Sequence, residues 1–244
     1  MPLGIIGRLK RALTVYQDQG TLAVIERLWR RIGRLFGHED PKLANWMKSK
    51  GVADAAFDAR MGTQTGGIQS LFDLQVVGEN SRHGLSHIAT DPQQFADVMA
   101  SLELDFTPCT FIDLGSGKGR ALILAAEFPF RRLIGVEFAV ELTEAARANI
   151  AVPEVAKLAN SRIELICCDA AAYAFPEEPL IIYLFNPFGA AIVRRIAQNA
   201  LLSWKSNPRP IEIIYMNPVH VSEFLAAGWI AINDSPVFAR LRPG

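Results

Sequence analysis

The sequence is poor in the features that mark secreted and metal-binding proteins. Its only cysteines, Cys109, Cys167 and Cys168, are too few and too clustered for a disulfide framework, and they lack the spacing of metal ligands. No apolar run approaches the roughly 18 residues that a membrane span requires. Near the start, Arg8 and Lys10 interrupt the apolar residues before a signal-peptide core forms. We therefore expect a cytoplasmic protein with no transmembrane segment and no metal site.

An excess of charge of either sign is also missing from the sequence as a whole. Lys plus Arg and Asp plus Glu both number 25 among the 244 residues. This balance excludes a global field that would attract nucleic acid or acidic ligands, so any such preference must be local. Half of the residues are hydrophobic and a fifth are charged, which allows a sizeable core and excludes a disordered or fibrous chain.

Positive charge is concentrated in residues 1–50, which hold ten basic and four acidic residues. Between residues 20 and 36, apolar residues recur at helical spacing, which predicts an amphipathic helix. Its other side carries Arg27, Arg30, Arg31 and Arg34. This cationic side predicts contact with an anionic surface, either a partner or a membrane leaflet, and packing of the apolar side on the rest of the protein is the alternative.

The remaining sequence divides into a connector and one domain. Glycines among polar residues from 51 to 84 predict a long irregular connector. Residues 1–84 are therefore interpreted as a basic helical extension with its connector, and residues 85–244 as the domain. Its first helix is expected to begin at a capping box, with Thr90 as the cap and Gln93 three residues later.

Short apolar runs alternate with helical patterns through the domain. Strands are predicted at residues 110–114, 133–137, 162–167, 180–185 and 211–216, with helices at 120–128, 140–150, 190–204 and 219–227. Alternation of this kind indicates an α/β fold whose parallel strands are joined by right-handed crossovers. The last residues, from Trp229 to Leu241, predict an antiparallel hairpin around a turn at Asn233.

The most informative segment runs from Phe111 to Arg120 (FIDLGSGKGR), where a buried strand enters a glycine-rich turn and a helix. Such a turn lets the backbone approach a nucleoside-containing ligand closely. A P-loop requires Ser or Thr after Gly-Lys, but Gly119 follows Lys118 here. A dinucleotide fingerprint requires a third glycine where Arg120 stands. ATP hydrolysis and nicotinamide or flavin binding are therefore disfavoured.

The acidic residues beside this turn suggest a different ligand. Asp113 lies at the end of the strand, where it can pair with a cationic amino group such as that of S-adenosylmethionine. Glu137 closes the next strand and can accept hydrogen bonds from ribose hydroxyls, and Asp169 follows a third strand, near the expected place of the adenine amine. The alternatives are a turn cap at Asp113, a solvated charge at Glu137 and a turn residue at Asp169.

With these residues, the sequence from about 85 to 244 resembles the class I S-adenosylmethionine-dependent methyltransferases. The DLGSG motif, which includes Gly115, Ser116 and Gly117, resembles in particular the non-SET histone-lysine methyltransferases and a set of bacterial relatives. The resemblance implies a Rossmann-like sheet of seven strands with a reversed last strand. It also implies that Asp113 or the glycine backbone holds the methionine end of the cofactor, Glu137 the ribose and Asp169 the adenine. Lys118 and Arg120, equally well explained as solvated charges, are left outside this site.

A second motif, Asn186-Pro187-Phe188, follows the fourth predicted strand. It resembles the Asn/Asp-Pro-Pro-Tyr/Phe motif of methyltransferases that act on amino groups, with one proline missing. In the full motif, the Asn carbonyl and a proline carbonyl accept hydrogen bonds from the target amine, and the aromatic ring stacks on the substrate. The three residues are therefore the candidate catalytic residues. The alternative is an Asx turn with Phe188 in the core.

His83 and His87 precede the first helix of the domain. In the family, this segment folds over the cofactor and often carries an aromatic residue near the position of His87. We therefore include His87 among the candidate cofactor-binding residues, and a surface position is the alternative. With no second ligand at close spacing, zinc binding is not expected.

Together these features predict an enzyme that transfers a methyl group from S-adenosylmethionine to an amine nitrogen of a protein lysine or a small molecule. One alternative is a nucleic-acid N-methyltransferase, suggested by the Asn-Pro-Phe motif and the basic first 50 residues. Another is a non-catalytic module that binds S-adenosylmethionine.

Overall fold

The computed structural model describes residues 41–69, 87–233 and 235–244. The chain divides into two compact units, residues 1–53 and 54–244. In the first unit, residues 41–53 form the beginning of helix α2 (Pro41–Met61). The second unit contains the end of α2 and the strands of both described sheets. The site described below lies within this second unit.

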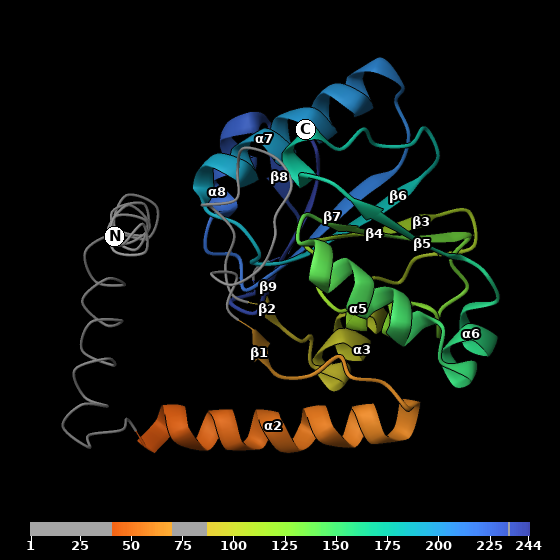
Figure 1. The fold of residues 1–244 in the computed structure, drawn as a ribbon. Helices are drawn as coiled ribbons and strands as arrows, with labels where there is room; N and C mark the ends of the chain where they lie inside the picture. Colours follow the sequence, from red (N-terminus) through yellow and green to blue (C-terminus); the bar gives the residue numbers. More distant parts are fainter. Residues whose placement is uncertain (1–40, 70–86, 234) are drawn as a thin grey trace, which may run out of the picture. The chain divides into compact units, whose positions relative to one another are not determined.

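A seven-stranded sheet forms the centre of the second unit (Figure 1). Its strands are β3 (Thr110–Leu114), β4 (Arg132–Glu137), β5 (Ile163–Cys167), β6 (Leu180–Phe185), β7 (Ile211–Met216), β8 (Trp229–Ala231) and β9 (Phe238–Pro243). They are arranged in the order β5-β4-β3-β6-β7-β9-β8. Strands β3 to β7 pair in parallel, whereas β9 is antiparallel to both of its neighbours. The predicted Rossmann-like α/β fold, with a mostly parallel sheet and a reversed last strand, is confirmed.

Helices cover both faces of the sheet. They are α3 (Pro92–Ala100), α4 (Arg120–Ala125), α5 (Val140–Ile150), α6 (Pro153–Ala159), α7 (Ala190–Ser206) and α8 (Val221–Ala227), with a short 3-10 turn, η3 (Ala170–Ala172). Because side chains alternate along a strand, Ile112 and Leu114 of β3 enter a core with α7 and α8, and Phe111 enters a core with α3 and α4. Figure 1 shows α7 and α8 on one side of the sheet and α3 on the other.

The apolar runs locate most of these elements correctly. The strands predicted at residues 110–114, 180–185 and 211–216 and the helix predicted at 140–150 have these same bounds in the structure. The predicted hairpin is also present, as β8 and β9. Helix α6 is not predicted by the pattern because it is short and begins at Pro153, with only two residues between it and the end of α5.

The prediction of an irregular connector from residue 51 is wrong for residues 51–61, which belong to α2. The buried side of this helix includes Asp54 as well as Phe57 and Met61. A charged residue on the buried side interrupts the apolar repeat by which such a helix is recognised.

The prediction that Thr90 caps the first helix of the domain is also wrong. Asp91 is the cap, and its Oδ1 accepts a hydrogen bond of 2.9 Å from the backbone N–H of Gln94. Asp91 directly precedes Pro92, the first residue of the helix, so it holds the N-cap position. Thr90 is buried instead, with its hydroxyl 3.4 Å from the hydroxyl of Tyr183 on β6.

A second, two-stranded sheet leads into α3. Strand β1 (Ile68–Gln69) pairs antiparallel with β2 (His87–Ile88). The backbone of His87 lies in β2, and His83 and the predicted cationic helix between residues 20 and 36 lie outside the described residues.

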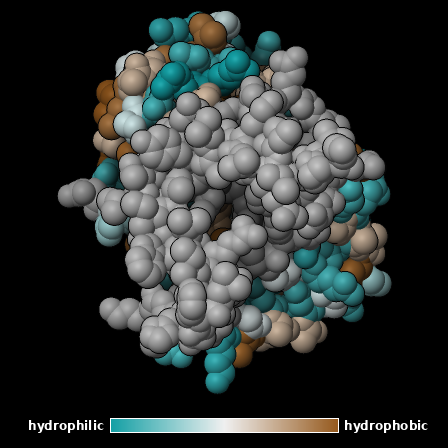
Figure 2. All heavy atoms as spheres, turned by 60° about the vertical axis from the view of Figure 1, so that its left-hand side comes forward, coloured by the Kyte–Doolittle hydropathy of each residue, from teal (hydrophilic) through white to brown (hydrophobic). Residues whose placement is uncertain are grey.

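In Figure 2, hydrophilic and hydrophobic residues are interspersed over the described surface in view. Exposed apolar side chains of the described residues include Leu202, Val219 and Ile230. Across residues 41–69, 87–233 and 235–244, no helix combines the length and the apolar character needed to cross a membrane.

Candidate functional site

The candidate site is a cleft at the carboxyl ends of the central strands. It contains about 580 Å³ of free space, part of it open to solvent. Strand β3 supplies Asp113, β4 supplies Glu137, and the segment after β6 supplies Pro187 and Phe188. The order of the strands reverses between the neighbouring strands β3 and β6, because the chain builds one half of the sheet from β3 outward and the other half from β6 outward. Ligands of open α/β sheets bind at such switch points.

The glycine-rich turn after β3 forms the floor of this cleft. Gly115, Gly117 and Gly119 have φ values of +82°, +54° and +88°, which L side chains rarely adopt. A Cβ atom on Gly115 would lie 2.6 Å from the Cβ of Pro187, so a side chain is also excluded there by lack of space. The N–H groups of Gly115 and Ser116 bind the carbonyl of Val136, at 2.8 and 3.1 Å, and so fix the turn to β4.

Ser116 is buried in this turn and lines the cleft. Its hydroxyl has no hydrogen-bond partner among the described residues. A Cβ atom on Gly135 of β4 would lie 2.9 Å from this hydroxyl, so the glycine at 135 provides the room for it. An unpaired buried hydroxyl beside a cleft is a group that a ligand can satisfy.

Glu137 joins the end of β4 to the glycine-rich turn. Its Oε2 accepts a hydrogen bond of 2.8 Å from the Gly117 N–H, and its Oε1 accepts one of 2.9 Å from the Ala139 N–H. Burial raises the pKa of this carboxyl, and the backbone hydrogen bonds offset only part of that effect. The predicted ribose-binding residue therefore lines the cleft and also fixes the turn.

Asp113 is the second buried acid of the cleft. Its side chain is 4% exposed, and burial, together with the nearby charge of Glu137, raises the pKa of its carboxyl to about 8. A cationic partner stabilises the charged form of such a buried acid, because it replaces the hydration that burial removes. The candidate site thus contains a buried acid suited to a positively charged ligand.

A smaller adjoining cavity extends toward η3. It has about 290 Å³ of free space and shares Gly115, Phe138 and Phe188 with the cleft. Asp169 lines it, and Oδ1 of Asp169 accepts a hydrogen bond of 2.9 Å from the Ala171 N–H. The predicted adenine-binding residue thus caps the 3-10 turn η3 and faces a cavity with aromatic walls, which is suited to a planar ring.

The structure separates the three candidate catalytic residues. Pro187 and Phe188 line the cleft, whereas Asn186 is not among its lining residues. Asn186 has a φ of +41°, and its Oδ1 accepts a hydrogen bond of 3.1 Å from the hydroxyl of Tyr215 on β7. The hydroxyl of Tyr215 also accepts a hydrogen bond of 3.3 Å from the backbone N–H of His220. The side chain of Asn186 is therefore held in one orientation.

Two further predictions concern the residues around this cleft. Phe188 lines both cavities and is also part of the core beside α7, so the pocket and core interpretations both describe it. The role of His87 stays a prediction, since only its backbone is described. Ile88, Ala89 and Thr90, which follow it, line the cleft, so this segment does reach the candidate site.

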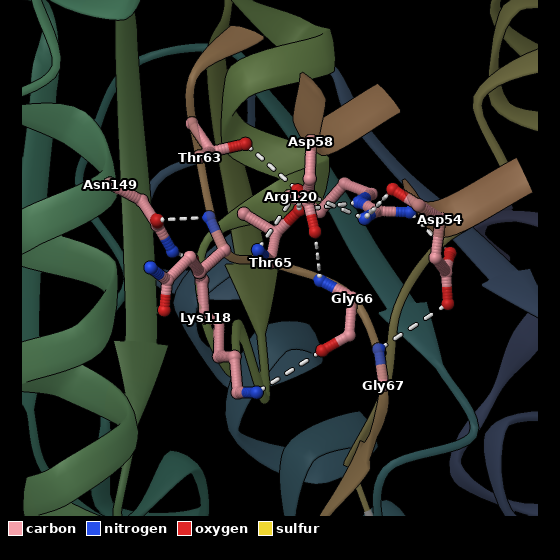
Figure 3. A network of polar contacts seen from close by, with 10 residues as sticks. Asp54, Asp58, Thr63, Thr65, Gly66, Gly67, Lys118, Arg120 and Asn149 are labelled. Atoms are coloured by element: carbon pink, nitrogen blue, oxygen red, sulfur yellow. Dashed lines mark hydrogen bonds and ion pairs between the residues drawn. The ribbon is translucent and has the colours of Figure 1, made fainter. Parts of the chain in front are cut away.

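Arg120 is buried and lines the cleft, in contrast to the solvated position expected from the sequence. Its guanidinium forms ion pairs with Asp54 at 2.5 Å and with Asp58 at 3.3 Å (Figure 3). Lys118, also expected to be solvated, donates a hydrogen bond of 3.1 Å to the carbonyl of Gly66. Asp54 and Asp58, one turn apart on α2 with Phe57 between them, are the signal that such a partner exists.

Comparison with known proteins finds structural similarity but no matching sequence family. Neither a family model nor a curated protein sequence matches this chain. One similar solved structure is that of the glycopeptide N-methyltransferase MtfA. It matches at 12% identity over 62% of this chain and 95% of that one, with a TM-score of 0.49. The mitomycin 7-O-methyltransferase MmcR matches at 17% identity over 63% of this chain, with a TM-score of 0.46, and this chain spans 54% of its length.

A third similar structure is a SAM-dependent methyltransferase from Geobacter sulfurreducens in complex with S-adenosyl-L-homocysteine. It matches at 19% identity over 59% of this chain and 66% of that one, with a TM-score of 0.42. All three identities are low, so the roles of individual residues are derived from this chain alone.

Proposed function

We propose that this chain binds S-adenosylmethionine in the cleft and transfers its methyl group to an amine nitrogen. The observation that carries the proposal is the position of Asp113, which is buried in the wall of the cleft together with Glu137. Burial and the charge of Glu137 raise its pKa to about 8, so a cationic partner would favour its ionised form. The amino group of S-adenosylmethionine is such a partner. The phosphates of a dinucleotide or of ATP would instead face two buried acids, Asp113 and Glu137, which opposes their binding.

The other residues of the cleft fit the remaining parts of this cofactor. The carboxyl group of Glu137 accepts backbone hydrogen bonds from Gly117 and Ala139, and its two oxygens have further acceptor capacity for a ribose hydroxyl. The smaller cavity, with Phe138, Phe188 and Asp169 in its walls, suits the adenine. The unpaired hydroxyl of Ser116 offers one more polar contact.

The chemistry of the reaction fits a site that mainly positions its reactants. When bound, the cofactor supplies an activated methyl group on a sulfonium centre. The residues of the chain then have to exclude water and hold the acceptor nitrogen in line with that methyl group. Phe185, Pro187 and Phe188 are the apolar lining residues suited to the first task.

Asn186 is the proposed group for the second task. Its Oδ1 accepts the Tyr215 hydroxyl and keeps a second lone pair. Asn186 does not itself line the cleft, so an acceptor amine that binds this lone pair has to reach past Pro187, which does. A side chain that a hydrogen bond already holds in one orientation needs little reorganisation when the methyl group is transferred. An amine of a protein lysine or a small molecule is therefore the proposed acceptor.

The acceptor is tested by incubating the full-length protein with radiolabelled S-adenosylmethionine and a cell lysate. The products are separated into protein, nucleic-acid and small-molecule fractions. Label in the protein or small-molecule fraction supports the proposal, and label in nucleic acid favours the nucleic-acid N-methyltransferase. Binding of the cofactor without label in any fraction indicates the non-catalytic module. The variant Asp113→Ala is the control for background labelling.

A further inference from the structure

Residues 54–67, which we call the latch segment, surround the side chain of Arg120 (Figure 3). Arg120 follows the glycine-rich turn as the first residue of α4, and its side chain is 1% exposed. Its Nε donates to the hydroxyl of Thr65 at 2.6 Å, and its Nη1 donates to Oδ1 of Asp54 at 2.5 Å. The guanidinium also lies 4.5 Å from the ring centre of Phe57, which is a cation–π contact.

Asp58 holds the latch segment together beneath this guanidinium. Its Oδ1 accepts hydrogen bonds from the hydroxyls of Thr63 and Thr65, at 2.8 and 2.7 Å, and its Oδ2 accepts the Gly66 N–H at 2.8 Å. Burial alone would raise the pKa of Asp58, but these hydrogen bonds outweigh it and hold the pKa below its usual value. The carboxylate is therefore charged and opposes the positive charge of Arg120.

Two more contacts fix the glycine-rich turn to the same segment. The Nζ of Lys118 donates to the carbonyl of Gly66 at 3.1 Å. Asn149 of α5 donates to the carbonyl of Lys118 at 3.0 Å and accepts the backbone N–H of Gln64 at 2.8 Å. The turn is thus held by Glu137 at one position and by the latch segment at the next ones along the chain.

The latch segment also leads to the wall of the cleft. It is followed by β1, which pairs with β2, and Ile88 to Thr90 come directly after the start of β2 and line the cleft. Thr90 in turn meets the hydroxyl of Tyr183 at 3.4 Å. The partners of Arg120 therefore belong to a segment that continues into one wall of the cleft.

A buried ion pair is weak support for a purely stabilising role, because well-packed apolar residues often stabilise a fold equally well. What a guanidinium adds is a rigid fork of donors with fixed directions. We propose that Arg120 is a positioning residue of the cofactor site, which holds the glycine-rich turn and the wall from Ile88 to Thr90 in the arrangement that binds S-adenosylmethionine. This inference rests on the proposed function.

The test compares the buried Arg120 with the half-buried Arg162 by calorimetric titration of the full-length protein with S-adenosylhomocysteine and by thermal melting. Arg120→Lys keeps the charge but loses the fork, and we expect its Kd to rise about tenfold or more, as for a displaced binding geometry. Arg162→Lys is the matched control, because Arg162 donates to five backbone carbonyls and does not line either cavity. It should lower the melting temperature and leave the Kd unchanged.

Two milder variants are measured in the same way, in case Arg120→Lys does not fold. Asp54→Asn and Thr65→Val each remove one partner of Arg120 with little change of volume, and both should raise the Kd. Hydrogen exchange of the wild type should show residues 54–67 and 115–119 gaining protection together when the ligand binds.

The outcomes separate this inference from the proposed function. If the wild type binds no S-adenosylhomocysteine, the proposed function fails and this inference fails with it. If the wild type binds, and the folded Arg120 and latch-segment variants bind as tightly as Arg162→Lys does, then Arg120 has a structural role alone and the inference is overturned.

Discussion

Burial, together with the nearby carboxylate of Glu137, raises the pKa of Asp113 to about 8. The two acids lie on neighbouring parallel strands and line the same cleft. Ionisation of both acids in one cleft is unfavourable without a ligand, since burial raises the pKa of each and the charge of Glu137 further opposes ionisation of Asp113. The proposed cofactor would bring positive charge and hydrogen-bond donors to this pair of acids.

The pKa of Asp113 predicts how stability depends on pH in the unliganded protein. Its folded value of about 8 lies above its ordinary value of 3.8, so the folded state holds a proton that the unfolded state loses. This stabilisation is complete below the ordinary value and is lost as the pH rises through 8, at no more than about 1.4 kcal/mol per pH unit. Between pH 3.8 and pH 8, the melting temperature of Asp113→Asn should therefore fall less steeply with pH than that of the wild type.

Thermal melts across this pH range check the prediction, with Asp105→Asn as the control. Asp105 is exposed, and hydrogen bonds from Thr107 lower its pKa, so this variant should not change the slope toward pH 8. The raised pKa of Glu137 acts in the same direction as that of Asp113, and some slope should remain in Asp113→Asn. Parallel curves for the wild type and Asp113→Asn would show that Asp113 is ionised in the folded protein.

Ser116→Ala should leave the unliganded protein at least as stable as the wild type. Its hydroxyl is buried without a partner among the described residues, and leaving such a group unpaired costs about 1–3 kcal/mol. Ser101→Ala is the matched control, because that hydroxyl donates to the carbonyl of Val98 at 2.7 Å and its removal should lower the melting temperature. If the hydroxyl of Ser116 binds the cofactor, Ser116→Ala should also weaken S-adenosylhomocysteine binding. Equal losses of stability in both variants would contradict this explanation.

Asn186→Ala should lower turnover by about 10²-fold with little change in cofactor affinity, because its carbonyl is proposed to act on the acceptor amine. Tyr215→Phe removes the hydroxyl that holds Asn186, so a smaller loss of turnover in the same direction is expected. Asn207→Ala, which removes a half-buried asparagine that donates to the carbonyl of Glu177, serves as the control. Single-turnover methyl transfer at the wild-type rate in Asn186→Ala would leave this residue as a turn former.

Phe188→Ala should lower the stability of the fold and also weaken the binding of S-adenosylhomocysteine, since the ring lies in the core and in the walls of both cavities. Loss of a buried phenylalanine costs about 3–5 kcal/mol of unfolding free energy. Phe224 belongs to the same core but lines neither cavity. Phe224→Ala should therefore lower the stability, while its folded fraction binds S-adenosylhomocysteine as tightly as the wild type does. Melts run beside calorimetric titrations distinguish the two effects, and unchanged affinity in Phe188→Ala would exclude its role as a wall.

The sequence predicts the sheet and the glycine-rich turn well because both depend on local signals. Residues 110–114 form a continuous buried strand, and glycines at 115, 117 and 119 have positive φ values that favour glycine. Arg120 lacks such a local signal. Its partner Asp54 lies 66 residues earlier, and charged residues are rarely buried unless they are paired, so the sequence alone favours a solvated position.

The same reason explains why α2 appears as a connector in the sequence. Its buried face depends on the pairing of Asp54 with Arg120, and this tertiary contact is invisible to an apolar repeat. For Glu137, the strand-end position predicts a place in the site, whereas its hydrogen bonds to Gly117 and Ala139 depend on the exact course of the turn. Sequence patterns therefore locate the cleft but miss the polar network that holds its shape.

The central claim, that this cleft binds S-adenosylmethionine through its two acids, is tested most directly by calorimetric titration of the full-length protein with S-adenosylhomocysteine. We expect binding at one site, and a loss of about 1.5–3 kcal/mol of binding free energy in both Asp113→Ala and Glu137→Ala, as for charge-assisted hydrogen bonds. Glu144→Ala, which removes an exposed glutamate of α5, should bind as the wild type does. Unchanged affinity in both acid variants, or tighter binding of NAD than of S-adenosylhomocysteine, would contradict the claim.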